Sequence, residues 1–490
     1  MQSKKTDVLI VTVPYTIGCS KPGISRAPAA PAILMSVLKN AGYSTHFYDL
    51  NAELNFNSSK EQFSLIEEFA TTDIFRFDII SYDVLSKIEF VDIILKTHIE
   101  KILDYNPKYI GISVFTYECL NWTKALCVYI REFAPDIKII LGGQGLNTHY
   151  LGDDENPAGK KIKEHGLCDY CVYKEGEDTI IDVLKNNHHV GEPEKQLKDL
   201  DRFPFPDYGD YKWKYYPKVV PIVGSRGCVR RCTFCNVPSL WREFVWRSGE
   251  QIVKEMVYQY EQTGISKFEF KDSLVNGSMK SYYDFITALA DYNKNSEVKL
   301  KWSGQFIFRP QRQHPTDFWE LTSKSADILY VGVESLSETI RNHMRKKFSN
   351  DDIRYSLAEM KKHNIRCKFF MIVGYITETE ETIQETFDMY KELSHYANNT
   401  IESISWPGVT LGIQPDTPLA EIAKEEGVQF NFNMLDWSGP STYEQRIEWK
   451  NRTIEYCKSL GYSVKFEKER SKKRYSDIKN VRPISWTKSA

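Results

Sequence analysis

Strand-like and helix-like stretches alternate six times between residues 219 and 409, and this alternation limits the possible folds more than any other feature. The helix-like stretches carry apolar side chains at helical spacing, as in 248–264. Six consecutive units predict a partial (β/α)6 barrel, in which reactive groups lie at the carboxyl ends of the strands. The predicted strands are 219–225, 267–273, 300–306, 328–335, 367–374 and 402–409.

A second alternation covers the first 190 residues, with strand candidates at 7–13, 44–50, 109–115 and 137–143. Helical stretches such as 28–42 separate them. This pattern predicts a doubly wound, Rossmann-like α/β domain, in which ligands bind beyond the carboxyl ends of the strands. Spacing alone predicts a ligand of nucleotide size or larger at that edge.

Composition narrows the class of protein. The chain has 490 residues, 41% hydrophobic and 27% charged, which is typical of a soluble protein with two or three domains. No apolar run approaches the roughly 18 residues of a membrane span, and no signal-peptide pattern opens the chain, so we expect a cytoplasmic protein without membrane contact.

The net charge of -2 predicts no general attraction to nucleic acid. The basic segment 461–490 is interpreted as solvated surface, with nucleic acid or an acidic partner as the alternative.

The sequence GSRGCVRRCTFCN, residues 224–236, places three cysteines at spacings of four and three. A structural zinc ion would need a fourth ligand, and no His or Cys follows within the next twenty residues. Three thiolates can instead hold three irons of a 4Fe-4S cluster and leave the fourth iron open. Nearby arginines favour the thiolate form. We therefore predict that the metal ligands are Cys228, Cys232 and Cys235.

The other cysteines are interpreted as packing residues. Cys168 and Cys171 have CxxC spacing, but a closed zinc site would need a second pair. Their alternating sequence predicts a buried strand with both thiols packed, in preference to metal or redox chemistry. Isolated cysteines in a reducing compartment usually behave as small buried hydrophobic residues. These are Cys19, Cys119, Cys127, Cys367 and Cys457.

The cysteine spacing, with Phe234 before the last cysteine, resembles the cluster loop of the radical S-adenosylmethionine (SAM) superfamily. The resemblance implies that SAM binds the open iron through its amino and carboxylate groups. One-electron reduction then yields a 5'-deoxyadenosyl radical that abstracts a hydrogen atom. In such enzymes the protein supplies orientation and excludes water.

Polar residues at the predicted strand ends face the position of a ligand. The motif GVES at 332–335 and the stretches 247–255 and 373–382 resemble radical SAM enzymes with an attached cobalamin domain. Gly374, Tyr375 and Ile376 depart from the Gly-x-Pro pattern that is common there. Capping of the following helix is the alternative role for each polar residue. The implied SAM contacts are Phe234, Asp272, Ser303, Gln305, Glu334 and Ser335.

The order of motifs in 111–145, 172–186 and 200–211 resembles cobalamin-binding domains fused upstream of radical SAM barrels. The D-x-H-x-x-G motif that supplies a histidine to cobalt in many cobalamin proteins is absent. His46 and His149 are interpreted as ordinary strand or loop residues, and the fused family commonly binds cobalamin without a protein histidine. The implied cobalamin contacts are Ser113, Thr116, Gly142, Gly143 and Gln144.

These patterns predict four regions: a cobalamin-binding domain at 1–192, a linker at 193–216, the barrel at 217–425, and a substrate-shaping region with a basic tail at 426–490. An insertion at 52–86 is expected within the first domain. Aromatic residues near the carboxyl terminus are interpreted as core, with stacking on a planar ligand as the alternative. They are Trp406, Trp437 and Trp449.

The predicted function is a cobalamin-dependent radical SAM enzyme that methylates an unactivated carbon. The alternatives are cyclisation or rearrangement, a first domain that binds substrate in place of cobalamin, and a non-catalytic metal or nucleic-acid binder. The expected partners are a substrate and an electron donor such as flavodoxin or ferredoxin. The sequence identifies no substrate and no catalytic acid or base.

Overall fold

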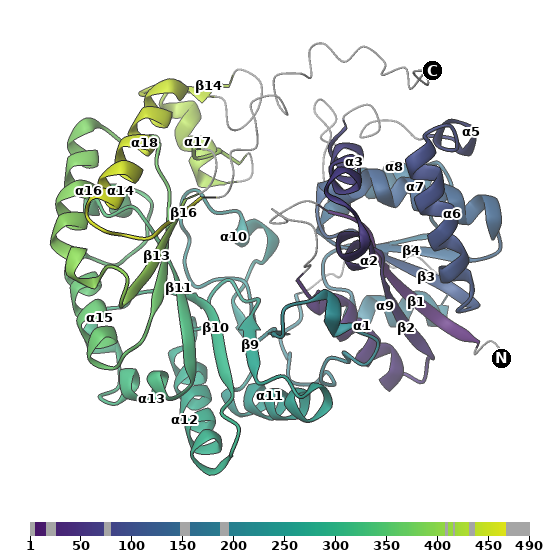
Figure 1. Cartoon of the computed structure of the whole chain (residues 1–490), viewed down its shortest axis with the longest axis horizontal. Coiled ribbons are helices and arrows are strands. Elements are labelled where there is room, and N and C mark those ends of the chain that lie inside the picture. Colours follow the sequence, from purple (N-terminus) through teal and green to yellow (C-terminus); the bar gives the residue numbers. More distant parts are fainter. Residues whose placement is uncertain are drawn as a thin grey trace. The chain divides into compact units, whose positions relative to one another are not determined.

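The computed structural model describes residues 5–15, 26–72, 80–147, 157–186, 196–406, 410–414, 417–430 and 437–466. The chain divides into two compact units (Figure 1). Of the described residues, the first unit contains those up to Leu197 and Arg202–Lys218, and the second contains Lys198–Asp201 and those from Val219 to Phe466. Each unit is described by itself.

The first unit contains a parallel sheet of five strands in the order β2-β1-β3-β4-β5. This order places the topological switch point between β1 and β3, where doubly wound sheets bind ligands at the carboxyl edge. The four predicted strands are confirmed, and Cys171 lies on the fifth. The strands are β1 (Thr6–Thr12), β2 (Thr45–Asp49), β3 (Pro107–Ser113), β4 (Lys138–Gly142) and β5 (Tyr170–Val172).

Amphipathic helices cover this sheet. The predicted insertion at 52–86 includes most of α2 and all of α3 and α5, and its residues 73–79 lie outside the described residues. Ser59 begins α3 with a capping box, because its hydroxyl accepts from Gln62 N–H while the Gln62 side chain accepts from Ser59 N–H. The helices are α1 (Ala29–Asn40), α2 (Leu50–Asn57), α3 (Lys60–Thr71), α5 (Tyr82–Leu85), α6 (Glu89–Leu103), α7 (Leu120–Phe133), α8 (Ala158–Glu164) and α9 (Glu177–Asn186), with 3-10 turns η1 (Tyr117–Cys119), η2 (Gln144–Asn147) and η3 (Trp213–Tyr215).

Residues 202–218 pack onto the first unit through buried tyrosines. The hydroxyl of Tyr216 donates to Asp49 at 2.5 Å, and that of Tyr215 donates to Glu53 at 3.0 Å. Burial raises the pKa of Asp49, while hydrogen bonds from Thr12 and Tyr216 oppose the shift. The segment is therefore fixed to this unit by hydrogen bonds to buried acids.

The second unit contains a parallel sheet of seven strands in the order β16-β13-β12-β11-β10-β9-β6 (Figure 1). The six predicted strands are confirmed, and the region predicted as an extension supplies a seventh, β16, beside β13. The strands are β6 (Val220–Ile222), β9 (Lys267–Phe270), β10 (Lys301–Phe306), β11 (Ala326–Glu334), β12 (Cys367–Met371), β13 (Ile401–Trp406) and β16 (Val464–Phe466), with short pairs β7 (Ser225–Arg226) with β8 (Val245–Trp246) and β14 (Gln429–Phe430) with β15 (Trp437–Ser438).

Helices alternate with these strands along the chain. The Ser248 hydroxyl caps α11, and Gly264 ends it in the left-handed conformation that glycine adopts at low cost. The helices are α10 (Val237–Leu240), α11 (Gly249–Thr263), α12 (Met279–Asn295), α13 (Phe318–Ser325), α14 (Glu338–His343), α15 (Asn350–Lys362), α16 (Glu380–Glu392), α17 (Pro418–Glu425) and α18 (Tyr443–Ser459), with 3-10 turns η4 (Gln311–Gln313) and η5 (Leu393–Tyr396).

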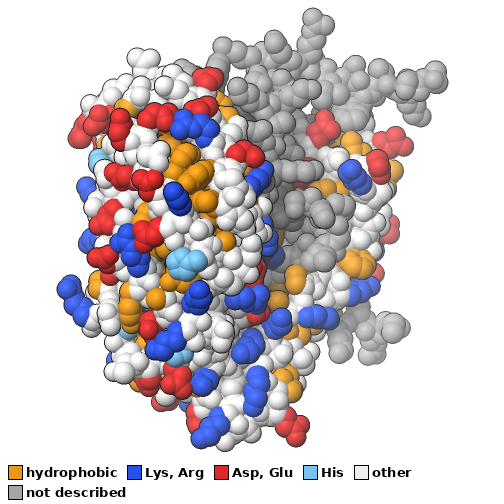
Figure 2. Space-filling model, turned by 60° about the vertical axis from the view of Figure 1, so that its left-hand side comes forward, with side chains coloured by type: hydrophobic (Ala, Val, Ile, Leu, Met, Phe, Trp, Pro, Cys, Tyr) orange, Lys and Arg blue, Asp and Glu red, His pale blue; other side chains and the backbone are white. Residues whose placement is uncertain are grey.

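The predicted fold class is confirmed: both large sheets are parallel and alternate with helices. Among the described residues, no helix has the length and apolarity to cross a membrane. Basic and acidic side chains are mixed over the face in Figure 2, in agreement with a net charge of -2.

The packing predictions for the single cysteines and for the CxxC pair are confirmed within the described residues. The thiols of Cys168 and Cys171 lie 3.7 Å apart, and both residues are buried. Cys19 lies outside the described residues. The others are buried, namely Cys119, Cys127, Cys367 and Cys457.

Candidate functional site

The three-cysteine loop follows the carboxyl end of β6, and contacts near its first and last cysteines hold it in place. Gly227 has a φ of 82°, and a Cβ there would lie 2.5 Å from the Glu243 carbonyl oxygen, so only glycine fits. The Thr233 N–H donates to the Met344 carbonyl at 3.1 Å, and its hydroxyl lies 2.7 Å from that of Tyr375. These contacts fix the path of the loop.

The thiols of Cys228, Cys232 and Cys235 lie close enough to influence one another. Burial raises the pKa of each thiol, and a neighbouring thiol of the same set raises it further, whereas Lys346 lowers it. Among the described residues, no three His, Cys, Asp or Glu side chains converge on one ion-sized point. The three cysteine ligands of a four-iron cluster bind three different irons, so their thiols need not converge on one point. The assignment to a cluster stays a prediction.

Glu334 ends β11 in a left-handed conformation, with a φ of 68°. A shift in register between Gly332 and Glu334 accompanies it. Lys346 Nζ donates to Glu334 Oε1 at 3.2 Å and lies 5.9 Å from the ring centroid of Phe234. A non-glycine residue at positive φ stores backbone strain and is often functional. The structure therefore brings Phe234, Glu334 and the cysteine loop together, as the prediction requires.

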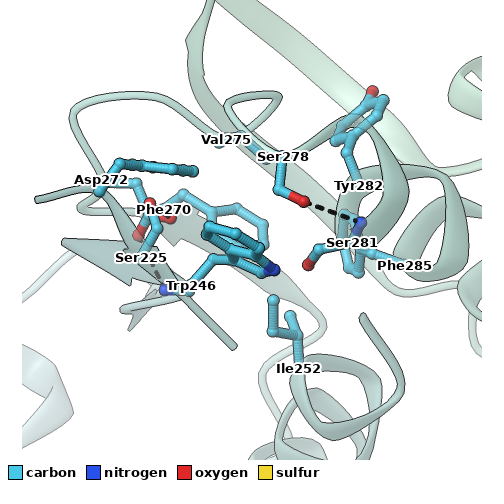
Figure 3. Close-up of a pocket in the computed structure, with 12 residues that line it drawn as sticks. Ser225, Trp246, Ile252, Phe270, Asp272, Val275, Ser278, Ser281, Tyr282 and Phe285 are labelled. Atoms are coloured by element: carbon cyan, nitrogen blue, oxygen red, sulfur yellow. Dashed lines mark hydrogen bonds between the residues drawn. The ribbon is translucent and has the colours of Figure 1, made fainter. Parts of the chain in front are cut away.

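Asp272 follows β9 and is buried. It accepts hydrogen bonds from Gly224 N–H at 2.8 Å and from the Ser225 hydroxyl at 2.7 Å. Burial raises its pKa to about 7, and these hydrogen bonds oppose the shift. Figure 3 shows Asp272 and Ser225 in a pocket that Trp246 also lines. Because Asp272 already binds the start of the cysteine loop, its first role is to position that loop.

The side chains of the remaining predicted SAM contacts differ in their hydrogen bonds and in their burial. The Ser335 hydroxyl accepts from Ser337 N–H at 3.1 Å, so this contact supports the alternative role in the turn before α14. Ser303 is buried within β10, and Gln305 is half-buried nearer its carboxyl end. Their assignment to SAM stays a prediction.

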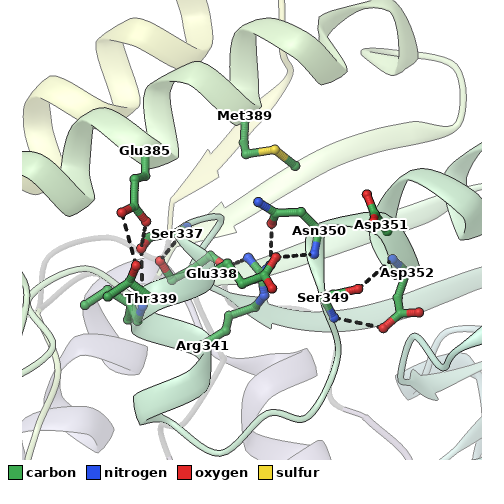
Figure 4. Close-up of polar contacts among 12 residues, drawn as sticks. Ser337, Glu338, Thr339, Arg341, Ser349, Asn350, Asp351, Asp352, Glu385 and Met389 are labelled. Carbon is green, nitrogen blue, oxygen red and sulfur yellow. Dashed lines mark hydrogen bonds and ion pairs between the residues drawn. The ribbon is translucent and has the colours of Figure 1, made fainter.

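The turn after β11 rests on a polar network (Figure 4). The buried Arg341 donates to the Ser335 carbonyl at 2.8 Å and to the Asn350 side chain. Glu385 accepts from the hydroxyls of Ser337 and Thr339. This network holds the turn that follows Glu334.

The departure from the Gly-x-Pro pattern has a structural counterpart. Gly374 has a φ of 88°, and the buried Glu378 accepts from the N–H groups of Gly374 and Tyr375. Burial raises the pKa of Glu378 to about 7, and these N–H groups oppose the shift. Two backbone hydrogen bonds thus hold the turn where the common pattern has a proline.

In the first unit, the predicted cobalamin contacts lie together at the carboxyl ends of β3 and β4. The Val114 N–H donates to the Gly142 carbonyl at 2.7 Å. Gly143 has a φ of 119°, and a Cβ there would lie 2.5 Å from the Val114 carbonyl oxygen. The Thr116 hydroxyl accepts from Glu118 N–H at 3.0 Å. Ser113 ends β3 and Gln144 begins η2.

Of the two histidines and three tryptophans interpreted from the sequence, all but one histidine lie within the described residues. His46 Nδ1 lies 3.1 Å from an oxygen of Asp210, which fits an ordinary strand residue, and His149 lies outside the described residues. Core packing is confirmed for the tryptophans, all of which are buried: Trp406, Trp437 and Trp449.

Sequence reasoning missed Lys346, which is buried beside the cysteine loop. It is the middle of three consecutive basic residues, a pattern that normally indicates a solvated surface. Arg309 and His314 were also missed, because isolated basic residues after a strand carry no motif. Only the predicted strand end at Phe306 could have directed attention to them.

Comparison with known proteins identifies the class of the second unit. Residues 222–390 match the sequence profile of the radical SAM superfamily. This span contains the cysteine loop and β9 to β12. The second unit therefore contains a radical SAM domain, as the cysteine spacing predicted.

Two curated proteins have distant sequence similarity to this chain. The bacteriochlorophyllide d C-12(1)-methyltransferase of Chlorobaculum tepidum is 24% identical over 66% of this chain and 71% of its own length. The anaerobic magnesium-protoporphyrin IX monomethyl ester cyclase of Rubrivivax gelatinosus is 23% identical over 63% of this chain and 58% of its own length.

Two solved structures share the fold of most of the chain. The methyltransferase TsrM from Kitasatospora setae, with cobalamin and a 4Fe-4S cluster bound, has a TM-score of 0.58 at 16% identity, covering 87% of this chain and 81% of that one. The cobalamin-dependent SAM radical enzyme OxsB has a TM-score of 0.65 at 15% identity, covering 92% of this chain and 66% of that one. At these identities the likeness shows the fold alone.

Proposed function

We propose that this protein is a cobalamin-dependent radical SAM enzyme that methylates an unactivated carbon. The observation that carries the proposal is the three-cysteine loop at the carboxyl end of β6, beside Glu334 and Lys346. Both solved structures named above hold cobalamin, which supports the assignment of the first unit.

The donor set fits an iron-sulfur cluster. Thiolates are the ligands that such clusters use, and the loop supplies three with no fourth Cys or His in its sequence neighbourhood. The cations Arg230 and Lys346 favour the thiolate forms of Cys232 and Cys228. These cysteines would hold the cluster, which together with SAM supplies one-electron cleavage chemistry when bound.

The edge of the first sheet fits a large ligand with an apolar face. Phe115, in the loop that follows β3, is 61% exposed, and its ring centroid lies 5.6 Å from that of Tyr15 in the loop after β1. These aromatic rings flank the switch point, where a doubly wound sheet receives its ligand. Gly143 brings backbone to the same edge without a side chain.

Methylation by this route uses two SAM molecules and two electrons. One SAM gives its methyl group and leaves S-adenosylhomocysteine, and the other takes the substrate hydrogen and leaves 5'-deoxyadenosine and methionine. The electrons come from an external donor, for which flavodoxin or ferredoxin is the proposed class. The protein's residues hold the reacting groups in position and exclude water.

Anaerobic reconstitution with iron, sulfide and hydroxocobalamin tests both cofactors together. We expect about four irons and one tightly held cobalt per chain after desalting. In Cys232→Ala the iron and SAM cleavage should be lost while cobalt is kept, because the two groups are assigned to separate units. Cys367→Ala, a buried cysteine on β12, serves as the control and should keep both. Four irons without cobalt would favour the alternative that the first unit binds substrate in place of cobalamin.

Ring closure is the second candidate reaction, favoured by the similarity to cyclases. Methylation adds one CH2 unit to the substrate mass and produces S-adenosylhomocysteine, whereas cyclisation does neither. Mass spectrometry of the products therefore separates the two reactions.

A further inference from the structure

Several nitrogen atoms near the cysteine loop have no hydrogen-bond partner. Arg230 lies between Cys228 and Cys232, and Arg309 follows β10 at its carboxyl end. The Nε atom of each arginine is buried, and neither has a partner within the described ranges. A buried polar group left unpaired destabilises the fold, so such atoms in a folded protein often indicate a bound ion or ligand.

The guanidinium groups of Arg230 and Arg309 influence each other electrostatically. Burial lowers the pKa of Arg309 to about 10, and repulsion from Arg230 adds to the effect. Arg309 is held in place by hydrogen bonds to the carbonyls of Asn276 and Gly277, both at 2.8 Å. The Arg230 guanidinium makes no hydrogen bond or ion pair with any residue that the structure describes. Arg309 is thus fixed, and Arg230 has its donors available.

A third unpaired donor comes from His314, which follows η4. Its ring is stacked on those of Phe318 and Tyr355, with centroids 4.4 Å and 5.8 Å away. Both ring nitrogens are buried, and no described residue contacts either by a hydrogen bond. Burial lowers the pKa of His314 to about 4, and Arg309 lowers it further, so the ring is neutral near pH 7 and donates one N–H.

The charge of Asp352 acts on both Arg230 and His314. It is engaged elsewhere: its Oδ2 accepts from Ser349 N–H at 2.8 Å in the capping box of α15 (Figure 4). Within the described residues, it forms no ion pair with either arginine. Besides Asp352, the groups whose negative charge acts on Arg230 are the thiols of Cys228 and Cys232, which are the proposed cluster ligands.

We propose that Arg230, Arg309 and His314 bind an oxyanion, a carboxylate or phosphate group, on a ligand that enters the barrel beside the cysteine loop. Guanidinium groups match the planar geometry of carboxylate and phosphate, and hydrogen bonds between charged partners are the stronger ones. The site itself follows from the unpaired donors. The identity of the molecule that carries the oxyanion rests on the proposed function: the oxyanion is either the methionine carboxylate of SAM or an acidic group of the substrate.

Calorimetric titration of the full chain with inorganic phosphate tests this site, with the desalted protein measured both with and without its cluster. Arg230→Gln should weaken phosphate binding at least about tenfold, because it removes a charged donor. This change removes no contact from the described fold, so loss of binding is not loss of structure. Arg309→Gln should act in the same direction. Arg312→Gln, on the exposed side of η4, removes the same charge and should stay within about twofold of the wild type.

A competition experiment separates the two sources of the oxyanion. If phosphate competes with SAM in the cluster-loaded chain, and Arg230→Gln weakens SAM about tenfold, the site binds the SAM carboxylate. If phosphate and SAM bind together and SAM affinity is unchanged, the site binds an acidic substrate. Both results support the oxyanion site.

Two results would overturn the proposal. In one, Arg230→Gln binds phosphate as tightly as the wild type does. In the other, the cluster-loaded chain binds none, which would mean that the cluster itself occupies the donors. Phosphate binding in a chain that takes up no iron would support the site and contradict the proposed function, so the two failures are distinguishable.

Discussion

Nζ of Lys346 lies 3.2 Å from Oε1 of Glu334, and both side chains are at most 15% exposed. Lys346 lowers the pKa of all three cysteine thiols in the loop, whereas Glu334 raises that of Cys232 and Cys235. A buried ion pair thus lies beside the proposed cluster ligands and sets the electrostatic potential there.

Replacement of Lys346 by methionine should make the reconstituted cluster harder to reduce. A nearby cation stabilises the more negative, reduced state, so its loss should lower the reduction potential by roughly 60 mV. A redox titration followed by electron paramagnetic resonance measures the shift. The control is Lys347→Met, the exposed neighbour, which should leave the potential unchanged. Equal potentials in wild type and Lys346→Met would show that the ion pair has no influence on the cluster.

Glu255→Gln should destabilise the second unit by about 1–3 kcal/mol. Glu255 and Arg247 form a buried ion pair between α11 and the residue before its N-cap, and Arg247 also pairs with Asp201 at 3.2 Å. The neutral amide would remove one negative charge beside the buried Arg247, which keeps its ion pair with Asp201. Denaturant unfolding measures the change. Glu261→Gln, exposed on the same helix, is the matched control, and an equal effect of both changes would contradict the role of the pair.

The stability of the first unit should fall between pH 6.5 and about 4 because of His98. Burial lowers the His98 pKa from 6.5 to about 4, and its Nδ1 lies 2.5 Å from the Tyr48 hydroxyl. Below pH 6.5 the unfolded chain takes up a proton that the folded chain does not, so the folded state loses stability as the pH falls, by up to about 1.4 kcal/mol per pH unit. His98→Gln should reduce this slope in urea unfolding, whereas His165→Gln, at an exposed position, should keep it. Parallel curves for all three proteins would exclude His98 as the cause.

The sequence predicted those parts of the fold that repeat. Six barrel strands and the cysteine loop were found because strand spacing and thiol spacing are local patterns. The seventh strand, Val464–Phe466, was missed because three residues carry little periodicity and pair only once β13 is in place. Lys346 and Arg309 were missed because burial of a single charge depends on tertiary contacts. Ser335 shows the opposite case, in which a motif residue already has a local hydrogen-bond partner.

Gly143→Ala should remove cobalamin binding and destabilise the first unit. Gly143 has a φ of 119°, and an added Cβ would meet the Val114 carbonyl oxygen at 2.5 Å, so the loops after β3 and β4 would have to separate. Gly166→Ala is the matched control, since Gly166 also has a positive φ, 73°, but an added Cβ there meets nothing within 4 Å. We expect the first change to cost at least about 2 kcal/mol more than the second.

Thermal unfolding and cobalt retained after desalting measure the two effects of Gly143→Ala separately. Because Gly166 lies away from the carboxyl ends of β3 and β4, Gly166→Ala should keep cobalt while losing the stability that a strained φ costs. A Gly143→Ala protein that unfolds like Gly166→Ala and retains cobalt would show that these loops tolerate a side chain. The ligand would then lie elsewhere on the sheet, and the assignment of Gly142, Gly143 and Gln144 to cobalamin would be wrong.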